Sequence, residues 1–403
     1  MDSTRHRAVA IARDVRNNDG ADWLDVGDAL ARLGVARQTL YAYVSRGLIR
    51  SRPADDDPRR SLYDRHAVET LVARRRRGRS RNAIAASTID WGEPVLVSRI
   101  TRINAGRLAY RGHDAVALSQ SATLEDVAAL LWEAPSLPYI APPRHASPKG
   151  ATPMARCLAA TAQLVAPVTF DRGRRALLSD ATRLLASMVA AVAGTHKGRP
   201  AHIALADAWH SDPGAADALR RALVLCADHE LNASTFAVRV AASTGASLPA
   251  CLLAGLATLS GPLHGGVTDR LRAMLAEPGL RRDPASAVAA RLARGEEIPG
   301  FGQRLYPNGD PRAAALFDAL SAGRTWHRLV TAVEEQTGRK PNIDAALVML
   351  EDVLHLPVGA AFALFAVGRT AGWIAHAMEQ HQDGRLIRPR AAYAGPEPPT
   401  STA

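Results

Sequence analysis

The sequence predicts a mainly α-helical protein, a large all-helical body preceded by a small winged helix-turn-helix domain. The body is predicted because Ala/Leu-rich segments of helical length, broken by Gly and Pro, dominate beyond residue 153, whereas β-branched runs of strand length are scarce. The first part differs in charge: residues 1–81 hold 18 Arg against 11 Asp plus Glu, so +7 of the chain's net +11 lies there. A basic first fifth indicates an anionic partner for that part.

The chain is expected to have four parts: a flexible tail at 1–20, the helix-turn-helix domain at 21–80, a linker at 81–95 and the helical body at 96–403. With 403 residues, 47% of them hydrophobic, it can bury a sizeable core. No apolar run reaches the roughly 18 residues that cross a membrane, and the beginning lacks a signal peptide's apolar region. We therefore expect a cytoplasmic protein with no membrane contact.

The three cysteines stand singly in apolar surroundings and form no CxxC pair. They are predicted to be reduced core residues, and we expect no metal site; they are Cys157, Cys226 and Cys251.

Within the first part, Asp25 is expected to cap a helix at 26–32 that Gly34 ends. A second helix is expected at 37–46, closed by Gly47, and the short connection gives a helix-turn-helix outline. Residues 48–52 and 60–63 flank a Pro/Asp turn, which indicates a hairpin or wing. Asp64 can cap a further helix that runs into four consecutive arginines at 74–77.

This pattern resembles the helix-turn-helix of MerR/excisionase-like winged-helix proteins over roughly 55 residues. The resemblance implies that the second helix enters the major groove of duplex DNA, facing it with Arg37, Gln38, Thr39, Tyr41 and Arg46. The alternative is a solvated charged face on a docking or dimerising module.

The body is expected to begin with a hairpin-like turn at 103–114. Thr123 is then expected to cap a helix that reaches Trp132, with Glu125 in its first turn to suit the helix dipole. Pro-rich residues 135–153 are expected to form a loop.

The segment Ser260-Gly-Pro-Leu-His264-Gly-Gly interrupts two apolar helical stretches. Proline and glycine are costly inside a helix, so they break it at the histidine. We expect the loop to hold the His264 imidazole beside a helix N-terminus, with exposed backbone N–H groups that favour developing negative charge. The alternative is a helix-breaking loop with an incidental histidine.

Arg369 lies in a helix expected at 360–380, which is too apolar for a surface element and carries Trp373 and His376 on the same face. A buried guanidinium needs a partner charge, either an internal carboxylate or an anionic ligand. Arg312 and Arg388 also follow helix breaks. Three arginines suit a di- or tricarboxylate, because each planar fork can bind a carboxylate through two hydrogen bonds.

In their order along the chain, eight polar motifs resemble the citrate synthase family over about residues 96–396. They begin at Tyr110 (Tyr-Arg-Gly), Asp228 (Asp-His-Glu-Leu-Asn-Ala-Ser-Thr), Gly261 (Gly-Pro-Leu-His-Gly-Gly), Gly300 (Gly-Phe-Gly), Asp310 (Asp-Pro-Arg), Pro341 (Pro-Asn-Ile-Asp), Gly368 (Gly-Arg-Thr-Ala-Gly-Trp-Ile-Ala-His) and Ile387 (Ile-Arg-Pro-Arg). The resemblance implies large and small all-helical domains, the small one at roughly 265–355. It also implies a homodimer without a tightly bound cofactor that condenses acetyl-CoA, oxaloacetate and water to citrate and CoA.

The resemblance also implies roles for single residues. Asp344 would take a proton from the acetyl-CoA methyl group, and His264 would hydrogen-bond the thioester oxygen and stabilise the enolate. Oxaloacetate would be held by His229, Arg312, Arg369 and, from the partner subunit, Arg388. Residues near CoA would be Leu263, Gly300, Gly302 and Asn342.

Gln303 departs from the family pattern, which has a histidine after Gly-Phe-Gly. Gln303 can still polarise the oxaloacetate ketone, but it cannot release a proton. Loss of one oxyanion donor costs about 2.7–4 kcal/mol, roughly 10²–10³ in rate, and we expect damage of that order. Three readings stay open: a citrate synthase weakened at Gln303, a 2-methylcitrate synthase, and a DNA-binding metabolite sensor whose catalytic body has decayed.

Overall fold

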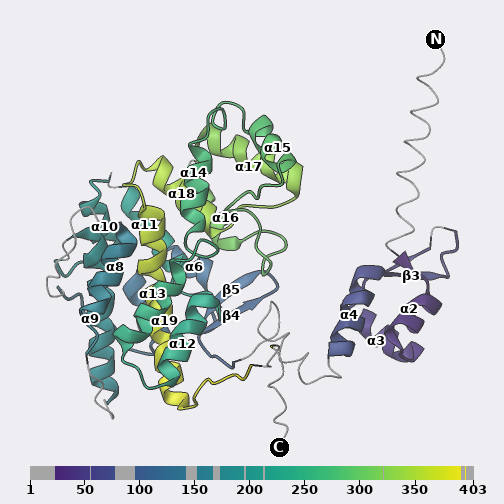
Figure 1. Ribbon diagram of the computed structural model, residues 1–403, viewed down its shortest axis with the longest axis horizontal. Helices are drawn as coiled ribbons and strands as arrows, with labels where there is room; N and C mark the ends of the chain where they lie inside the picture. The colour runs from purple at the N-terminus through teal and green to yellow at the C-terminus, as the bar shows by residue number, and fades with distance from the viewer. Residues whose placement is uncertain are drawn as a thin grey trace, which may run out of the picture. The chain divides into compact units, whose positions relative to one another are not determined.

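The computed structural model describes residues 23–54, 56–77, 96–141, 152–166, 173–194, 197–211, 214–320, 322–391 and 395. The chain divides into two compact units, residues 1–97 and 98–403, which Figure 1 shows in purple and in blue to yellow. The expected tail at 1–20 and linker at 81–95 lie outside the described residues.

The first unit places three helices on a small antiparallel sheet. Its elements are β1 (Trp23–Leu24), α2 (Val26–Leu33), α3 (Arg37–Ser45), β2 (Ser51–Pro53), β3 (Ser61–Asp64) and α4 (Arg65–Arg77). The Asp25 carboxylate accepts the Asp28 N–H, and Gly34 ends α2 at a φ of 59°, as predicted. Asp64 caps α4 by accepting the Ala67 N–H at 3.0 Å. The hairpin of β2 and β3 is confirmed.

The strand order β1-β3-β2 contains one strand that the sequence did not predict. β1 has two residues, too few for an alternating pattern to appear. A separate core closes this unit, formed by Leu24, Ala29, Leu33, Leu40, Ile49, Tyr63 and Val68. The unit therefore buries its own apolar side chains.

The second unit begins with a three-stranded antiparallel sheet of β4 (Thr101–Asn104), β5 (Arg107–Tyr110) and β6 (His113–Asp114). The predicted hairpin is therefore present, with a third strand beside it. Thr123 caps α7 (Leu124–Leu131), but its capping-box partner is Asp126. Glu125 lies in the first turn of α7, as predicted. Its side chain is buried and accepts the Ala201 N–H at 2.8 Å, so a distant backbone donor also holds it.

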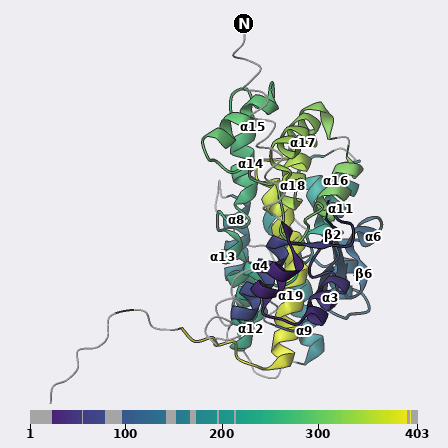
Figure 2. The same cartoon turned by 90° about the vertical axis from the view of Figure 1, so that its right-hand side faces the viewer.

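The other helices of the body fill the rest of the chain. They are α6 (Ala115–Ser119), α8 (Pro153–Ala162), α9 (Arg174–Ala193), α10 (Ala201–Ala208), α11 (Ala215–Leu225), α12 (Ala233–Ser243), α13 (Leu248–Leu259), α14 (Val267–Leu275), α15 (Pro284–Ala293), α16 (Pro311–Ala319), α17 (Gly323–Thr337), α18 (Ile343–Val353) and α19 (Ala360–Asp383). In both views α14, α15 and α17 lie at one end of the body (Figures 1 and 2).

Helix α19 forms the centre of the larger part of the body (Figures 1 and 2). It ends three residues later than predicted, and 20 of its 24 residues are buried, which explains why it is apolar all round. Two glycines let its backbone approach the chain beside it. A Cβ at Gly368 would lie 2.7 Å from the Leu223 carbonyl oxygen, and one at Gly372 would lie 2.2 Å from Oδ1 of Asp228.

Among the described residues, α9 is the one helix long and apolar enough to cross a membrane. It packs against α8, α10 and α19, and half of its residues are buried among them. A core helix of this kind passes the same test of length and composition, so the packing of the body explains its apolar sequence.

Candidate active site

The loop between α13 and α14 holds His264 three residues before α14 begins, as predicted. It folds as successive tight turns, and a Cβ at Gly265 would meet the Leu259 carbonyl oxygen at 2.6 Å. The expectation of exposed backbone N–H groups fails for three residues of this loop. The N–H groups of His264 and Gly266 donate to the Gly261 carbonyl, and that of Gly265 donates to the Leu259 carbonyl, at 2.9–3.2 Å. The imidazole of His264 is the side chain that the loop presents.

The His264 imidazole is fixed by neighbours from two helices, α12 and α19. Its Nε2 lies 2.9 Å from Oγ of Ser234, and its ring meets the Phe365 ring edge-on at 6.1 Å. The Trp373 indole N–H also donates to Ser234 Oγ, at 3.3 Å. Burial, with a smaller contribution from the charge of Arg369, lowers the pKa of His264 to about 4. The ring is therefore neutral at physiological pH.

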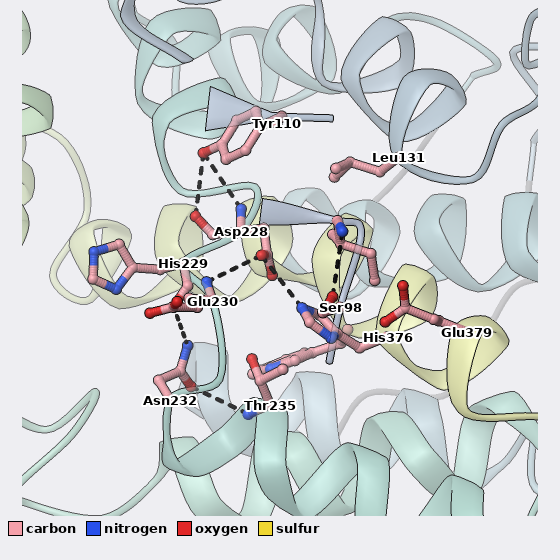
Figure 3. Close-up of polar contacts among 12 residues, drawn as sticks. Ser98, Tyr110, Leu131, Asp228, His229, Glu230, Asn232, Thr235, His376 and Glu379 are labelled. Carbon is pink, nitrogen blue, oxygen red and sulfur yellow. Dashed lines mark hydrogen bonds and ion pairs between the residues drawn. The ribbon is translucent and has the colours of Figure 1, made fainter. Parts of the chain in front are cut away.

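The segment 228–235 lies against α19 and brings Asp228 and His229 to the centre of the body (Figure 3). The Asp228 carboxylate is fully buried and accepts the Glu230 N–H at 3.2 Å, and its Oδ2 lies 3.4 Å from Nε2 of His376. Burial opposes its ionisation, but the charges of His376 and Arg369 outweigh this and lower its pKa. A buried carboxylate thus lies beside the candidate site.

His229 faces Tyr306, whose hydroxyl oxygen lies 3.0 Å from its Nε2. Burial and the nearby charges of Arg312 and Arg369 lower the pKa of His229 well below its ordinary value. Like His264, it is a neutral imidazole that can give or take one hydrogen bond at each nitrogen.

Arg369 is 1% exposed and has no carboxylate within ion-pair distance among the described residues. Its Nε donates to the Cys226 carbonyl at 2.8 Å, and its guanidinium lies over the Phe365 ring at 4.8 Å. No described residue accepts from its Nη2. Burial lowers its pKa, and Asp228 opposes that effect. A buried cation with an unsatisfied donor is the signature of a site for an anion.

Arg312 is also 1% exposed, but it already has a partner. Its Nε and Nη2 donate to the two carboxylate oxygens of Asp310 at 3.0 and 2.7 Å. Burial disfavours its charge, and Asp310 outweighs that and raises its pKa. Asp310 therefore occupies the edge of the guanidinium formed by Nε and Nη2. The other edge, with both Nη1 hydrogens and the second Nη2 hydrogen, is left to bind a ligand.

Asp344 stands in the first turn of α18, where Asn342 caps the helix by accepting the Asp344 N–H at 3.0 Å. Burial raises the pKa of Asp344 to about 6, against the opposing charges of Arg312 and Arg369. It is thus a carboxylate whose basicity is increased, and its charge interacts with both buried arginines.

The turn at 300–306 adjoins Asp344 through hydrogen bonds to Asn342. The Asn342 N–H donates to the Gly300 carbonyl at 2.9 Å, and its side chain donates to the Gly302 carbonyl at 3.2 Å. Gly300 and Gly302 have φ values of 82° and 84°, which other residues rarely adopt. The Gln303 amide oxygen lies 3.4 Å from the Leu305 N–H.

Two further residues that were predicted for the site, Leu263 and Arg388, are exposed and lie outside the group of buried side chains described above. Leu263 is 88% exposed at the tip of the histidine loop. Arg388 is exposed in the segment after α19, and the structure gives it no hydrogen bond or ion pair with a described residue. No group of three or more His, Cys, Asp or Glu side chains in the described part of the chain is placed to hold a metal ion.

In the first unit, α3 turns its predicted DNA-facing residues outward and Leu40 inward. Arg37, Gln38, Tyr41 and Arg46 are exposed, and Thr39 is partly exposed. The arginines at 74–77 belong to α4, but their side chains lie outside the described residues.

Comparison with known proteins identifies the body. The family model described as citrate synthase, C-terminal domain, matches residues 90–390, about three quarters of the chain. The chain belongs to the citrate synthase family. Residues 1–89 lie outside this match.

Members of the citrate synthase family with assigned names resemble part of the chain. Citrate synthase 2 of Bacillus subtilis is 38% identical over 191 residues, 45% of this chain and 51% of that protein. Putative citrate synthase 2 of Mycobacterium tuberculosis is 40% identical over 199 residues, 46% and 53% of the two chains. 2-Methylcitrate synthase 1 of Corynebacterium glutamicum is 34% identical over 187 residues, 44% and 49%. The chain spans about half the length of these relatives.

Solved structures of the citrate synthase family match over a larger part. The Thermotoga maritima enzyme has a TM-score of 0.65 at 26% identity, over 76% of this chain and 94% of that one. A ternary complex of carboxymethyl coenzyme A and oxaloacetate with the Thermoplasma acidophilum enzyme also has a TM-score of 0.65 at 26% identity, over 77% and 96%.

Sequence reasoning missed the roles of Tyr306, Ser234 and Asp310 in this citrate synthase-like site. Ser234 and Asp310 belong to motifs quoted above, and Tyr306 lies four residues after the Gly-Phe-Gly motif, so the sequence placed all three near residues predicted for the site. What it lacked was the tertiary contact that pairs Tyr306 with His229 and Ser234 with His264. The pairing of Asp310 with Arg312 is local, and a carboxylate two residues before a buried arginine was readable from the sequence.

Proposed function

We propose that the body condenses an acyl-CoA with oxaloacetate and water to form citrate, or its methyl homologue, and CoA. The observation that carries this is the buried Nη2 of Arg369, which no described residue satisfies, beside the basic carboxylate of Asp344 and the neutral imidazole of His264. Membership of the citrate synthase family and the ternary complex of the Thermoplasma acidophilum relative support it.

The first proposed step removes a proton from the carbon next to the thioester carbonyl. Such a proton is weakly acidic, so a base needs a hydrogen-bond donor aimed at the developing oxyanion. Asp344 is the base and His264 the donor. Because Nε2 of His264 faces Ser234, the donating hydrogen is on Nδ1, which requires the Ser234 hydroxyl to give its proton to Nε2.

Oxaloacetate is proposed to bind through its two carboxylates. Arg369 gives Nη2 and Arg312 gives Nη1, the donors that the structure leaves without a partner, and His229 adds a neutral donor beside them. Arg388 is proposed to complete the site from the partner subunit of a homodimer, because in its own chain it lies exposed beyond α19. A stable and fully active monomer in sedimentation experiments would contradict that assignment.

The acyl-CoA is proposed to lie against the exposed loop tip at Leu263 and the turn at Gly300, Gly302 and Asn342. Gly300 and Gly302 give that turn a left-handed backbone that other residues rarely adopt. We propose residues 265–355 as the small subdomain, which carries Asn342 and the turn at Gly300 and Gly302, whereas Leu263 lies just before it. CoA enters as substrate and leaves as product, with no tightly bound cofactor. Acetyl-CoA and propionyl-CoA are both candidates, because the named relatives include citrate and 2-methylcitrate synthases.

A second candidate function is that of a DNA-binding metabolite sensor. Two observations favour it. Gln303 lacks the acid of the family pattern. Four side chains on α3 and at the residue after it are exposed: Arg37, Gln38, Tyr41 and Arg46. Under this hypothesis residues 21–80 form a winged helix-turn-helix domain and the body binds oxaloacetate without turnover. The retained Asp344 favours the enzyme, since a sensor has no use for a base.

The deciding experiment measures citrate, 2-methylcitrate and free CoA formed by the full chain from oxaloacetate with acetyl-CoA or propionyl-CoA. We expect turnover, a loss of turnover in Asp344→Asn, and a moderate rise in kcat in Gln303→His. If neither the parent nor Gln303→His forms any of these products, the sensor replaces the enzyme.

A further inference from the structure

Tyr306 is a buried phenol at the candidate site that no step above uses. Its side chain is 2% exposed, and its hydroxyl oxygen lies 3.0 Å from Nε2 of His229. The guanidinium carbon of Arg312 lies 5.6 Å from the centre of its ring. Tyr306 therefore adjoins two residues that are proposed to hold oxaloacetate.

The same turn carries Gln303. The Tyr306 N–H donates to the Gln303 carbonyl at 3.0 Å, and the Leu305 N–H donates to the Gln303 side-chain oxygen at 3.4 Å. The amide oxygen is thus directed back onto the turn, and the amide NH₂ is left as the donor. The amide of this turn cannot release a proton, whereas the phenol can. Burial raises the pKa of Tyr306, so the phenol gives up its proton only when a base as strong as an alkoxide forms.

The hydrogen bond between Tyr306 and His229 has a preferred direction. His229 is neutral, so one ring nitrogen carries a hydrogen and the other a lone pair. A phenol is a stronger acid than a neutral imidazole, so the stronger arrangement has the phenol donate to Nε2. The ring hydrogen of His229 then sits on Nδ1, on the other side of the ring.

We propose that Tyr306 supplies, through His229, the proton that the new alkoxide takes when the carbon–carbon bond forms. This inference rests on the proposed condensation and names the acid that replaces the histidine missing at Gln303. Gln303 keeps the task of polarising the ketone through its NH₂ group.

The step balances in atoms and electrons. The enolate carbon bonds to the ketone carbon, and the C=O π pair moves to oxygen. That alkoxide takes the Nδ1 proton of His229 while Nε2 takes the phenol proton, which leaves a phenolate beside the Arg312 guanidinium. The phenolate regains a proton from water and Asp344 returns the methyl proton to water, so the condensation consumes no net proton.

Tyr306→Phe tests this together with Gln303→His and the double variant. We expect Tyr306→Phe to lower kcat by about 10²-fold, because a positioned acid contributes at least that much. The oxaloacetate Kd should stay within about threefold, since the charged ligands remain. Gln303→His should raise kcat less than about tenfold in the parent but about 10²-fold in Tyr306→Phe, because it restores an acid that only the second protein lacks.

Tyr110→Phe is the matched control. It also removes a buried hydroxyl, but that hydroxyl lies only against backbone groups, the Val224, Leu225 and Asp228 carbonyls and the Asp228 N–H. Any loss it causes is structural, and Gln303→His should not rescue it. A Tyr306→Phe protein within threefold of the parent kcat overturns the inference. So does a loss of equal size with and without His at position 303.

Exchange of the acyl-CoA methyl hydrogens with deuterated water separates the two proposals. This exchange needs Asp344 and His264 but no protonation of an alkoxide. A parent that neither exchanges hydrogens nor forms product refutes the condensing enzyme itself. A parent that exchanges hydrogens but forms product only after Gln303→His refutes the Tyr306 assignment alone, because the body then condenses its substrates only when a histidine supplies the acid.

Discussion

The two units of the chain hold their arginines in opposite environments. Arg37, the first residue of α3, and Arg46, directly after its end, are exposed, whereas Arg312 and Arg369 in the body are each 1% exposed. An exposed guanidinium is hydrated and needs no partner, so its presence is compatible with solvent, DNA or protein. A buried guanidinium must find a counter-charge or a ligand. The body's arginines therefore say more about function than those of the first unit.

Within the body, the contrast between Arg312 and Arg369 sharpens this lesson. The carboxylate of Asp310 balances the charge of Arg312. The carboxylate that most affects the pKa of Arg369 is that of Asp228, which lies beyond ion-pair distance and is itself bonded to His376. A bound dianion would therefore change the hydrogen bonding and the charge balance of Arg369 more than those of Arg312.

The largest expected effect is on catalysis in the body. Asp344→Asn removes the base but keeps nearly the same shape, so kcat should fall by about 10³-fold or more. Oxaloacetate binding, which rests on the arginines, should persist in calorimetry. A variant that keeps more than a tenth of the parent kcat would show that Asp344 is not the base.

The second effect concerns the first unit. We expect duplex DNA binding that weakens by tenfold or more between about 50 and 200 mM salt, because arginines that neutralise phosphates release counterions. Arg37→Ala together with Arg46→Ala should weaken binding and reduce the salt slope, measured by fluorescence anisotropy. The body's kcat should not change. A full chain without duplex affinity at low salt would leave α3 as a solvated or protein-docking face.

The third effect tests whether the two cores are independent. Leu40→Ala leaves a cavity in the first unit and Leu347→Ala leaves one in the body, and each should cost about 2–5 kcal/mol. Denaturation followed by two probes should show each loss confined to its own unit. A shared loss would show that the units unfold together.

The fourth effect is a pH dependence of the body. The pKa of Asp344 in the free protein is raised to about 6, and the base acts as the carboxylate. The value of kcat/KM should therefore fall towards tenfold per pH unit below about pH 6 and level off above it. His264, with a pKa of about 4, stays neutral across that range. A fall in activity centred near pH 4 would show that the pKa of Asp344 is not raised in this way.

Much of the architecture was predictable because it depends on local signals. Helix ends at Asp25, Gly34 and Asp64 follow from capping chemistry, and α19 follows from its apolar run. Strand β1 was not predictable, since two residues carry no period. The histidine loop was placed correctly, but its backbone hydrogen bonds close within the turns, a detail that residue types alone do not show.

The candidate site was predictable as a set of residues and not as a set of contacts. The motifs named His229, His264, Asp344 and the arginines. The partners that set their chemistry come from remote positions, such as Ser234 for His264 and Tyr306 for His229. Such pairs depend on how helices pack, which spacing along the chain does not reveal.

Calorimetric titration of oxaloacetate into the full chain and into Arg369→Met tests most directly whether the buried arginine binds a dianion. We expect binding by the parent and a loss of 10²-fold or more in the variant, with its melting temperature measured alongside to show that it is folded. Arg369→Lys, which keeps the charge but loses the planar fork, should lie between them. A folded Arg369→Met protein that binds oxaloacetate as tightly as the parent, or a parent that does not bind it, would contradict the proposed site.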